Sequence, residues 1–277
     1  MKKAADSEYA QNYTTCFLQD GDAFVLQTEF LMQILEGIHK YLPNIKHVTT
    51  YARADSIARK SVSELRELKT AGIEHLYCGM ETGSDLILRK INKGFDTATI
   101  IISGTKAKEA GMVLSEFTLF GIGGKELAEE NAVETAKVLN VIKPDFVRVH
   151  ATGIKLSSEM WNYVKNKELT LQSEEEIVSE QKIMLELLAD DMDCIYMNEH
   201  IVNLLLEVRG NIRTDKQNML ETINTYLQLP KQEQELFNLG RRLNIMFFLA
   251  DLNNRAKRKQ TEEGLRKIKT QNPDLDL

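Results

Sequence analysis

Acidic residues stand directly after two short apolar runs of this sequence, where a strand would end. Residues 13–18 are followed by Asp20 and Asp22, and residues 75–78 are followed within three positions by Glu81. A carboxylate at the end of a buried strand is poorly solvated unless it holds a cation or a hydrogen-bond donor. The residue types and their spacing therefore favour a site for a positively charged or donor-rich ligand.

A glycine-rich loop and an arginine follow two further apolar runs. Gly121, Gly123 and Gly124 lie within four positions, and glycines let the backbone approach a ligand while the next helix offers free N–H groups. Arg53 stands where a guanidinium could clamp a carboxylate or a phosphate. The glycine loop lacks the Lys-Ser/Thr pair of a phosphate loop and does not follow the first strand, as a dinucleotide fingerprint would.

Each of these residues also has a structural interpretation. Asp22 could form a turn and cap a helix, and Arg53 could pair with Asp55. A third interpretation is a barrel hydrolase in which Asp20, Asp22 and Glu81 hold Mg²⁺, because hard cations take carboxylate oxygens. No nucleophile or base accompanies that trio, and the residues alone leave these alternatives open.

The apolar runs belong to a regular alternation of two kinds of segment. Short runs rich in β-branched or aromatic residues predict strands, and capped or amphipathic stretches between them predict helices. The strands are expected at 13–18, 47–51, 75–78, 114–120 and 146–150, and the helices at 28–41, 61–71, 84–91, 97–110 and 126–142. This order predicts an α/β fold with a mostly parallel sheet, either open and doubly wound or part of a (β/α) barrel, with its site at the carboxyl ends of the strands.

The alternation stops after residue 150. Ser173 and Glu176 predict a capping box, and residues 214–228 and 230–253 predict amphipathic helices. The last residues, 255–277, form a charged tail whose basic side chains are expected on a solvated helix face. The C-terminal region is therefore predicted to be mostly helical.

Composition and charge restrict the class of protein. The chain has 277 residues, of which 43% are hydrophobic and 27% charged, and its formal net charge is −6. That charge argues against binding to nucleic acid, and the apolar runs are far shorter than the ~20 residues that span a bilayer. The N-terminus has no apolar signal-peptide core, and three widely spaced cysteines suit a reducing compartment. We therefore expect a cytoplasmic protein whose three cysteines are buried as small hydrophobic side chains.

Three segments resemble the radical S-adenosylmethionine (SAM) superfamily. Residues 17–26, Phe-Leu-Gln-Asp-Gly-Asp-Ala-Phe-Val-Leu, are similar to its second-strand segment. Residues 79–94 read Gly-Met-Glu-Thr-Gly-Ser-Asp and then Leu-Arg-Lys-Ile-Asn-Lys-Gly, which is similar to the specific pattern G-x-E-S/T-G-S-D … L-x-x-I-x-K-G. Residues 120–127 resemble its fifth-strand loop. The resemblance covers about residues 14–150 and is nearest to the coproporphyrinogen oxidase-like group.

The resemblance implies a fold and a chemistry. The fold is a partial TIM-type (β/α) barrel over residues 13–155, preceded by a polar segment over 1–12 and followed by a helical extension over 156–254. The chemistry is that of a [4Fe–4S] cluster that binds SAM and cleaves it to a 5′-deoxyadenosyl radical, which takes a hydrogen atom from the substrate. By match of motif, the residues expected to contact SAM are Gly21, Asp22, Glu81, Ser115, Gly121, Gly123 and Gly124.

One part of the family pattern has no counterpart in this chain. Three thiolates of a Cys-x-x-x-Cys-x-x-Cys loop hold the cluster in the superfamily, and Cys16, Cys78 and Cys194 do not match that loop. Two hypotheses follow: an N-terminally truncated radical SAM enzyme of unknown substrate, or a non-catalytic SAM- or partner-binding protein on a degenerate barrel. Truncation is favoured because a lost βα unit would leave an exposed strand edge, which would also promote self-association. The chain as it stands is predicted not to cleave SAM.

Overall fold

The strands form one sheet in which sequence order is also spatial order, β1-β2-β3-β4-β5-β6-β7. The structure is a computed structural model that describes residues 10–271. The strands are β1 (Thr15–Leu18), β2 (His47–Ala52), β3 (Ile73–Glu81), β4 (Val113–Phe120), β5 (Phe146–Ala151), β6 (Ile195–Met197) and β7 (Gly210–Asn211). The pairs β1–β2, β2–β3 and β3–β4 are parallel, and β6–β7 is antiparallel. Within the described residues β1 and β7 are the two ends of the sheet, which stays open.

Helices alternate with the first five strands, as predicted, and dominate the rest of the chain. They are α2 (Thr28–Tyr41), α3 (Ala54–Arg59), α4 (Val62–Thr70), α5 (Asp85–Lys90), α6 (Thr97–Glu109), α7 (Ala128–Ile142), α8 (Met160–Lys165), α9 (Glu174–Leu187), α10 (Ile212–Leu227), α11 (Lys231–Arg242) and α12 (Arg255–Gln271). Short 3₁₀ turns add η1 (Ala10–Asn12), η2 (Ala23–Val25), η3 (Lys125–Leu127) and η4 (Leu249–Asn253). The α/β fold class and the helical C-terminal region are confirmed.

Several elements differ from the prediction in position or number. β3 runs from Ile73 to Glu81, so Glu81 is the last residue of the strand rather than part of a following loop. The helix α3, the helix α8 and the strands β6 and β7 were not predicted, because each has at most six residues and shows no periodicity. Residues 1–9 of the predicted polar segment and 272–277 of the charged tail lie outside the described residues.

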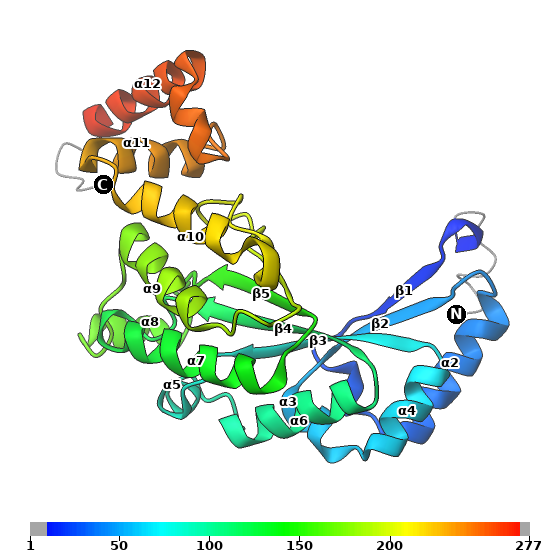
Figure 1. Cartoon of the computed structure of the whole chain (residues 1–277). Helices are drawn as coiled ribbons and strands as arrows, with labels where there is room; N and C mark the ends of the chain where they lie inside the picture. Colours follow the sequence, from blue (N-terminus) through cyan, green and yellow to red (C-terminus); the bar gives the residue numbers. More distant parts are fainter. Residues whose placement is uncertain (1–9, 272–277) are drawn as a thin grey trace. The chain divides into compact units, whose positions relative to one another are not determined.

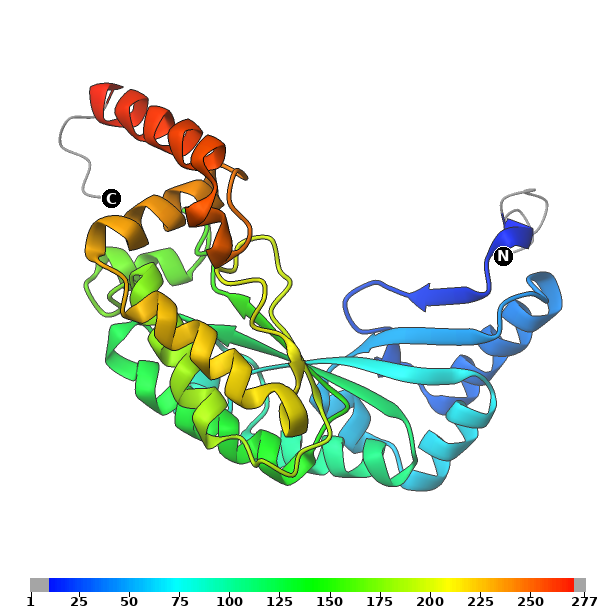
Figure 2. The same ribbon diagram turned by 45° about the horizontal axis from the view of Figure 1, so that its top comes forward.

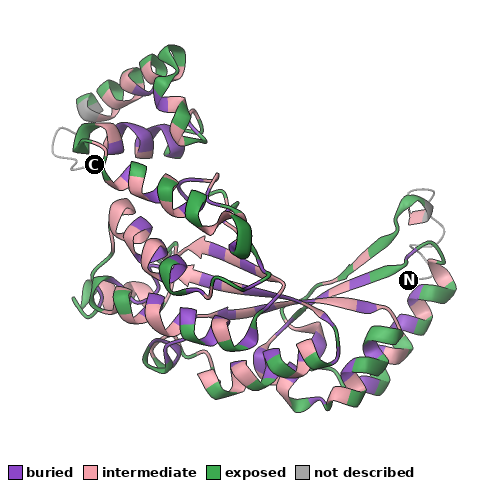
Figure 3. Ribbon diagram, viewed as in Figure 1, coloured by how far each residue is buried: buried purple, intermediate pink, exposed green. Residues whose placement is uncertain are grey.

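The chain divides into two compact units. Unit 1 comprises Met1–Thr118 and Lys137–Val147, and unit 2 comprises Leu119–Ala136 and Arg148–Leu277. In unit 1, helices α2 and α4 cover one face of strands β1 to β3 (Figures 1 and 2). The core of unit 1 is formed by leucines that are each at most 1% exposed (Figure 3). They are Leu31 and Leu35 of α2, Leu65 of α4 and Leu76 of β3.

Unit 2 is built mainly from helices around β5 to β7. Helix α9 packs on α10, and α11 packs on α12. The capping box predicted at the start of α9 is present, with the Ser173 hydroxyl accepting from the backbone N–H of Glu176 and the Glu176 carboxylate accepting from that of Ser173. The same device starts α4 at Ser61 and Glu64. No helix within residues 10–271 is both long and apolar enough to cross a membrane.

Candidate functional site

The loop after β1 makes a tight turn at Gly21. The backbone N–H of Asp22 donates to the carbonyl of Asp20 at 2.8 Å, and Gly21 between them has a φ of 73°. This left-handed region is open to glycine at little cost. A Cβ added at Gly21 would meet no atom within 4 Å, so the space beside the turn is free.

The end of β3 repeats this turn with a residue that carries a side chain. The backbone N–H of Thr82 donates to the carbonyl of Met80 at 2.8 Å, and Glu81 between them has a φ of 63°. The left-handed conformation costs an L-residue other than glycine on the order of 1–2 kcal/mol. Strain of this kind collects at functional sites, where the surrounding contacts enforce it.

The contacts that enforce the turn come from Lys93 and Gly79. The Lys93 Nζ donates to the Glu81 Oε1 at 2.7 Å, and the two side chains are only 15% and 21% exposed. A Cβ at Gly79 would lie 2.5 Å from that same oxygen, so a larger residue here would displace the Glu81 carboxylate from its observed position. The register against β4 also shifts here, from Gly79 opposite Phe117 to Glu81 opposite Thr118. Such bulges redirect a side chain at the end of a strand.

Asp22 and Glu81 are connected by a chain of hydrogen bonds through Arg53. The Asp22 carboxylate accepts the backbone N–H of Arg53 at 3.1 Å and the hydroxyl of Ser56 at 2.5 Å. The guanidinium of Arg53 donates to the Asp55 carboxylate at 3.0 Å and to the carbonyl of Lys93 at 2.9 Å. The predicted Arg53–Asp55 pair is thus present, and the helix α3 that carries Ser56 positions Asp22.

A buried acid, Glu116, lies in β4 of the same unit. It is fully buried, and neither of its carboxylate oxygens has a hydrogen-bond partner among the described side chains and backbone. Burial raises the pKa of Glu116 to about 8, and the neighbouring Cys78 thiol lowers it in part. The carboxyl group is therefore mostly protonated at neutral pH. The sequence interpretation missed this residue, although an acid within an apolar strand was a visible signal.

Ser115 lies beside Glu116 in sequence and points to the opposite face of β4. Its hydroxyl lies 2.8 Å from the His75 Nε2, and the ring of His75 stacks on Tyr77 with centroids 4.2 Å apart. Tyr77, Gly79 and Glu81 occupy alternate positions at the end of β3. Ser115 is fully buried and lies next to an aromatic cluster of unit 1.

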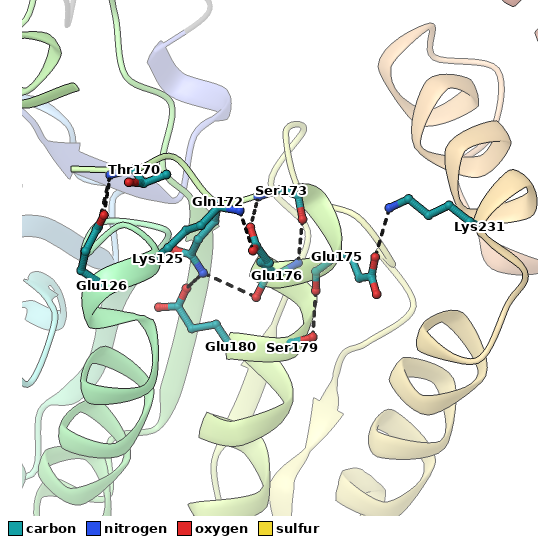
Figure 4. A network of polar contacts seen from close by, with 10 residues as sticks. All are labelled: Lys125, Glu126, Thr170, Gln172, Ser173, Glu175, Glu176, Ser179, Glu180 and Lys231. Atoms are coloured by element: carbon teal, nitrogen blue, oxygen red, sulfur yellow. Dashed lines mark hydrogen bonds and ion pairs between the residues drawn. The ribbon is translucent and has the colours of Figure 1, made fainter. Parts of the chain in front are cut away.

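The three glycines of the predicted loop belong to unit 2 and are buried there. The backbone N–H of Gly121 donates to the Glu180 Oε2 at 3.0 Å, and the Gln172 amide donates to the same oxygen at 2.8 Å (Figure 4). Burial raises the pKa of Glu180 to about 7. A Cβ at Gly124 would lie 2.9 Å from the carbonyl oxygen of Thr170, so this glycine makes room for the chain's own backbone.

The donor set of the chain does not fit a [4Fe–4S] cluster. Cys78 and Cys194 are buried as expected, whereas Cys16 is half-buried because β1 is the end strand of the sheet. Burial raises the pKa of Cys16 and of Cys78, which disfavours the thiolates that ligate iron. Within residues 10–271 no group of three or more His, Cys, Asp or Glu side chains could hold a metal ion.

The residues around Glu81 and Gly21 in unit 1 fit SAM better than the cysteines fit a cluster. The contact with Lys93 uses the Oε1 of Glu81. The Oε2 of Glu81 makes no hydrogen bond among the described residues. SAM carries an ammonium group, a sulfonium and ribose hydroxyls, all of which suit a carboxylate acceptor. The space beside Gly21 is open as well.

The chain was compared with protein families and with individual known proteins. No protein-family model matches the chain. The heme chaperone HemW of Bacillus subtilis is 24% identical over 173 residues, which cover 62% of this chain and 45% of the relative. The chain therefore spans less than half the length of this curated relative.

The chain is also similar to solved structures. Elp3 of the archaeon Methanocaldococcus infernus matches with a TM-score of 0.50 and 14% identity over 64% of this chain and 45% of that one. Coproporphyrinogen III oxidase (HemN) of Escherichia coli, a radical SAM enzyme, matches with a TM-score of 0.49 and 14% identity over 62% of this chain and 40% of that one.

Proposed function

Because this chain is related to the radical SAM superfamily and its coproporphyrinogen oxidase-like group, as its motifs predicted, we propose that it binds S-adenosylmethionine in unit 1. The site lies at the carboxyl ends of β1 and β3. The observation that carries this proposal is the strained turn at Glu81, whose carboxylate is held by Lys93 and given room by Gly79. A strained backbone that presents a poorly solvated carboxylate is typical of a ligand site.

Each residue has a defined part in the proposed binding. The free Oε2 of Glu81 accepts a hydrogen bond from the ligand's ammonium group or a ribose hydroxyl. Asp22 fixes the loop that opens beside Gly21 through its bonds to Arg53 and Ser56. Ser115 is proposed as a further contact in unit 1 on the strength of the motif match alone. Gly121, Gly123 and Gly124 belong to unit 2, and their contact with SAM stays a prediction of the motif match.

The first test of this proposal is thermal unfolding with and without ligand. A ligand that binds only the folded state raises the melting temperature in proportion to its concentration over its Kd. We expect SAM and S-adenosylhomocysteine to stabilise the protein, and an equimolar mixture of adenosine and methionine to have a smaller effect. No shift with SAM at saturating concentration would refute the proposal.

For the reaction, two proposals remain, and they differ in whether this chain takes part in catalysis. The first is a radical SAM enzyme that needs a segment with cluster-binding cysteines in addition to residues 1–277. The second is a non-catalytic SAM-binding protein. The lack of fitting cluster ligands within the described residues is compatible with both. Reading the coding DNA upstream of Met1 separates them, since an in-frame Cys-x-x-x-Cys-x-x-Cys would support the first.

We predict that the chain of residues 1–277 alone does not cleave SAM. The measurement is anaerobic reconstitution with iron, sulfide and a reductant, followed by assays of bound iron and of 5′-deoxyadenosine. We expect no 5′-deoxyadenosine above the level of a protein-free control. Product formed in proportion to bound iron would contradict the prediction and would place cluster ligands within this chain.

A further inference from the structure

Unit 2 contains a pocket that none of the motifs predicted. Its volume is about 530 Å³, and its wall is formed by the residues after β5, the start of α9, and α11. Pockets of roughly 300–1,000 Å³ are the usual size for small-molecule sites. All of its lining residues belong to unit 2, whereas Asp22 and Glu81 belong to unit 1. The pocket therefore shares none of these residues with the proposed SAM site.

Two buried oxygens of the pocket's lining residues have no hydrogen-bond partner. These are the Thr152 Oγ1 and the Gln172 Oε1. The amide of Gln172 is held in one orientation, because its Nε2 donates to the Glu180 carboxylate at 2.8 Å (Figure 4). A buried polar atom without a partner costs about 1–3 kcal/mol, which a ligand that supplies hydrogen-bond donors would recover.

The charges of the lining leave one carboxylate uncompensated. Arg242 donates to Glu174 at 2.6 Å, and Lys231 pairs with Glu175 at 3.1 Å. The carboxylate of Glu235 makes no ion pair or hydrogen bond among residues 10–271. The lining therefore carries an excess of one negative charge, which favours a cationic ligand.

The remaining wall is apolar. Ile177, Val202 and Leu239 line the pocket together with Ala151. An ammonium group alone would gain little from these side chains, whereas an apolar ring or chain would bury its surface against them. The lining thus combines an apolar wall, two oxygens that need donors, and one free carboxylate.

From these features we propose that the pocket binds a small amphiphilic amine. The ammonium group pairs with Glu235, the apolar body lies against Ile177, Val202 and Leu239, and N–H groups next to that body donate to Thr152 and Gln172.

The test is a fluorescence titration of the intact chain with two probes that share one fluorophore. Dansylcadaverine carries a primary amine, and dansylglycine carries a carboxylate. We expect dansylcadaverine to bind with one-to-one saturation and with a Kd lower than that of dansylglycine by about fivefold or more, the factor that one partly exposed ion pair supplies. Equal affinities, or a signal that does not saturate, would overturn the proposal.

Variants locate the binding in this pocket. Glu235→Gln is expected to weaken dansylcadaverine binding by about fivefold, and the control Glu129→Gln, which removes an exposed carboxylate elsewhere in unit 2, is expected to leave it unchanged. Val202→Trp, which fills the pocket from a partly exposed position, is expected to abolish binding while the circular dichroism spectrum stays the same.

Two results would contradict the assignment. One is a Glu235→Gln variant that binds dansylcadaverine like the wild type. The other is displacement of dansylcadaverine by SAM, which would show that one site serves both ligands. Because the Glu235 carboxylate makes no hydrogen bond or ion pair within the described residues, its substitution is not expected to unfold the chain.

Discussion

At the scale of single residues, the position of the Glu81 carboxylate depends on its backbone as much as on its partners. The left-handed φ of 63° turns the side chain toward Lys93, and the missing side chain at Gly79 leaves the space that the carboxylate occupies. The strain and the ion pair can be separated by substitution, because glycine and alanine both remove the carboxylate but only glycine relieves the backbone.

We predict that Glu81→Gly is more stable than Glu81→Ala by about 1 kcal/mol, because alanine must adopt the unfavourable φ. Urea unfolding of the two variants measures this difference. The matched control is the same pair of substitutions at Tyr51 of β2, which is partly exposed and pairs in regular register with Tyr77, where the alanine variant should be the more stable one. Equal stabilities of the two variants at Glu81 would show that the turn is not strained.

A second prediction concerns the buried acid Glu116. Its pKa is about 8 in the folded protein, above the ordinary value of about 4.5, so the folded state holds a proton that the unfolded state loses between these values. The free energy of unfolding should therefore fall as the pH rises from 5 to 8, by at most about 1.4 kcal/mol per pH unit for this group. Glu180, with a pKa of about 7, acts in the same direction.

The measurement is urea unfolding at pH 5, 6.5 and 8. Glu116→Gln keeps the size of the side chain and carries no charge, so its stability should depend less on pH than that of the wild type. The exposed Glu36 serves as the control, since Glu36→Gln should leave the pH dependence as it is. A wild-type stability that rises over this range would mean that Glu116 is ionised in the folded state.

The sequence identified only part of the site at this scale. Asp22 and Glu81 were expected in a site, because an acid after an apolar run and a family motif both pointed to them, and their contact with a ligand stays a prediction. Lys93 and Gly79 belong to the same motif, but the sequence did not show that they position the carboxylate of Glu81. That role is visible only from their distances to Glu81 in the structure. Glu180 could not be predicted, because its partner Gly121 is far away in sequence and meets it only in the folded chain.

At the scale of elements, the side chain of Asn203 forms hydrogen bonds with backbone groups of β5. The Asn203 amide donates to the carbonyl of Val149 at 2.7 Å, and its oxygen accepts the backbone N–H of Ala151 at 2.8 Å. Asn203 is only 4% exposed and lies in a segment with no regular structure. Its side chain thus takes the place of a neighbouring strand.

We predict that Asn203→Leu lowers the free energy of unfolding by about 3 kcal/mol, because two buried backbone groups of β5 lose their partners. Hydrogen exchange at the amide of Ala151 should become faster. Asn162→Leu, at an exposed position of α8, is the control and should change the stability by less than about 0.5 kcal/mol. Unchanged exchange at Ala151 would mean that β5 does not depend on Asn203.

The elements that could be predicted are those with strong local signals. The strand β2 and the helix α2 lie within one residue of their expected limits, and Ser61 and Ser173 cap their helices as predicted. The strands β6 and β7 could not be predicted, because they have only three and two residues. Their antiparallel pairing joins Ile195 with Asn211 and Tyr196 with Gly210, which are far apart in the sequence. The prediction that Cys16 is buried was wrong for a similar reason. The order of the strands, which the sequence does not show, decides which strand lies at the end of the sheet and is therefore less buried.

At the scale of the whole molecule, the fold and its family relationship are clearer than the reaction. The α/β class follows from the alternation and agrees with the fold of the archaeal Elp3 structure. The motifs in residues 17–26 and 79–94 agree with the similarity to HemW. The reaction could not be predicted, because the cysteines of this chain do not form a cluster site. Binding of SAM is therefore the central claim, and it can be tested without a cluster.

The most direct test is isothermal titration calorimetry of SAM with the metal-free protein. We expect saturable one-to-one binding to the wild type, weakened by about tenfold or more in Glu81→Ala, because a hydrogen-bonded charge pair contributes about 1.5–3 kcal/mol. Glu36→Ala, at an exposed position of α2 in the same unit, should bind like the wild type. Absence of binding to the wild type, or equal affinity in Glu81→Ala, would contradict the proposed site.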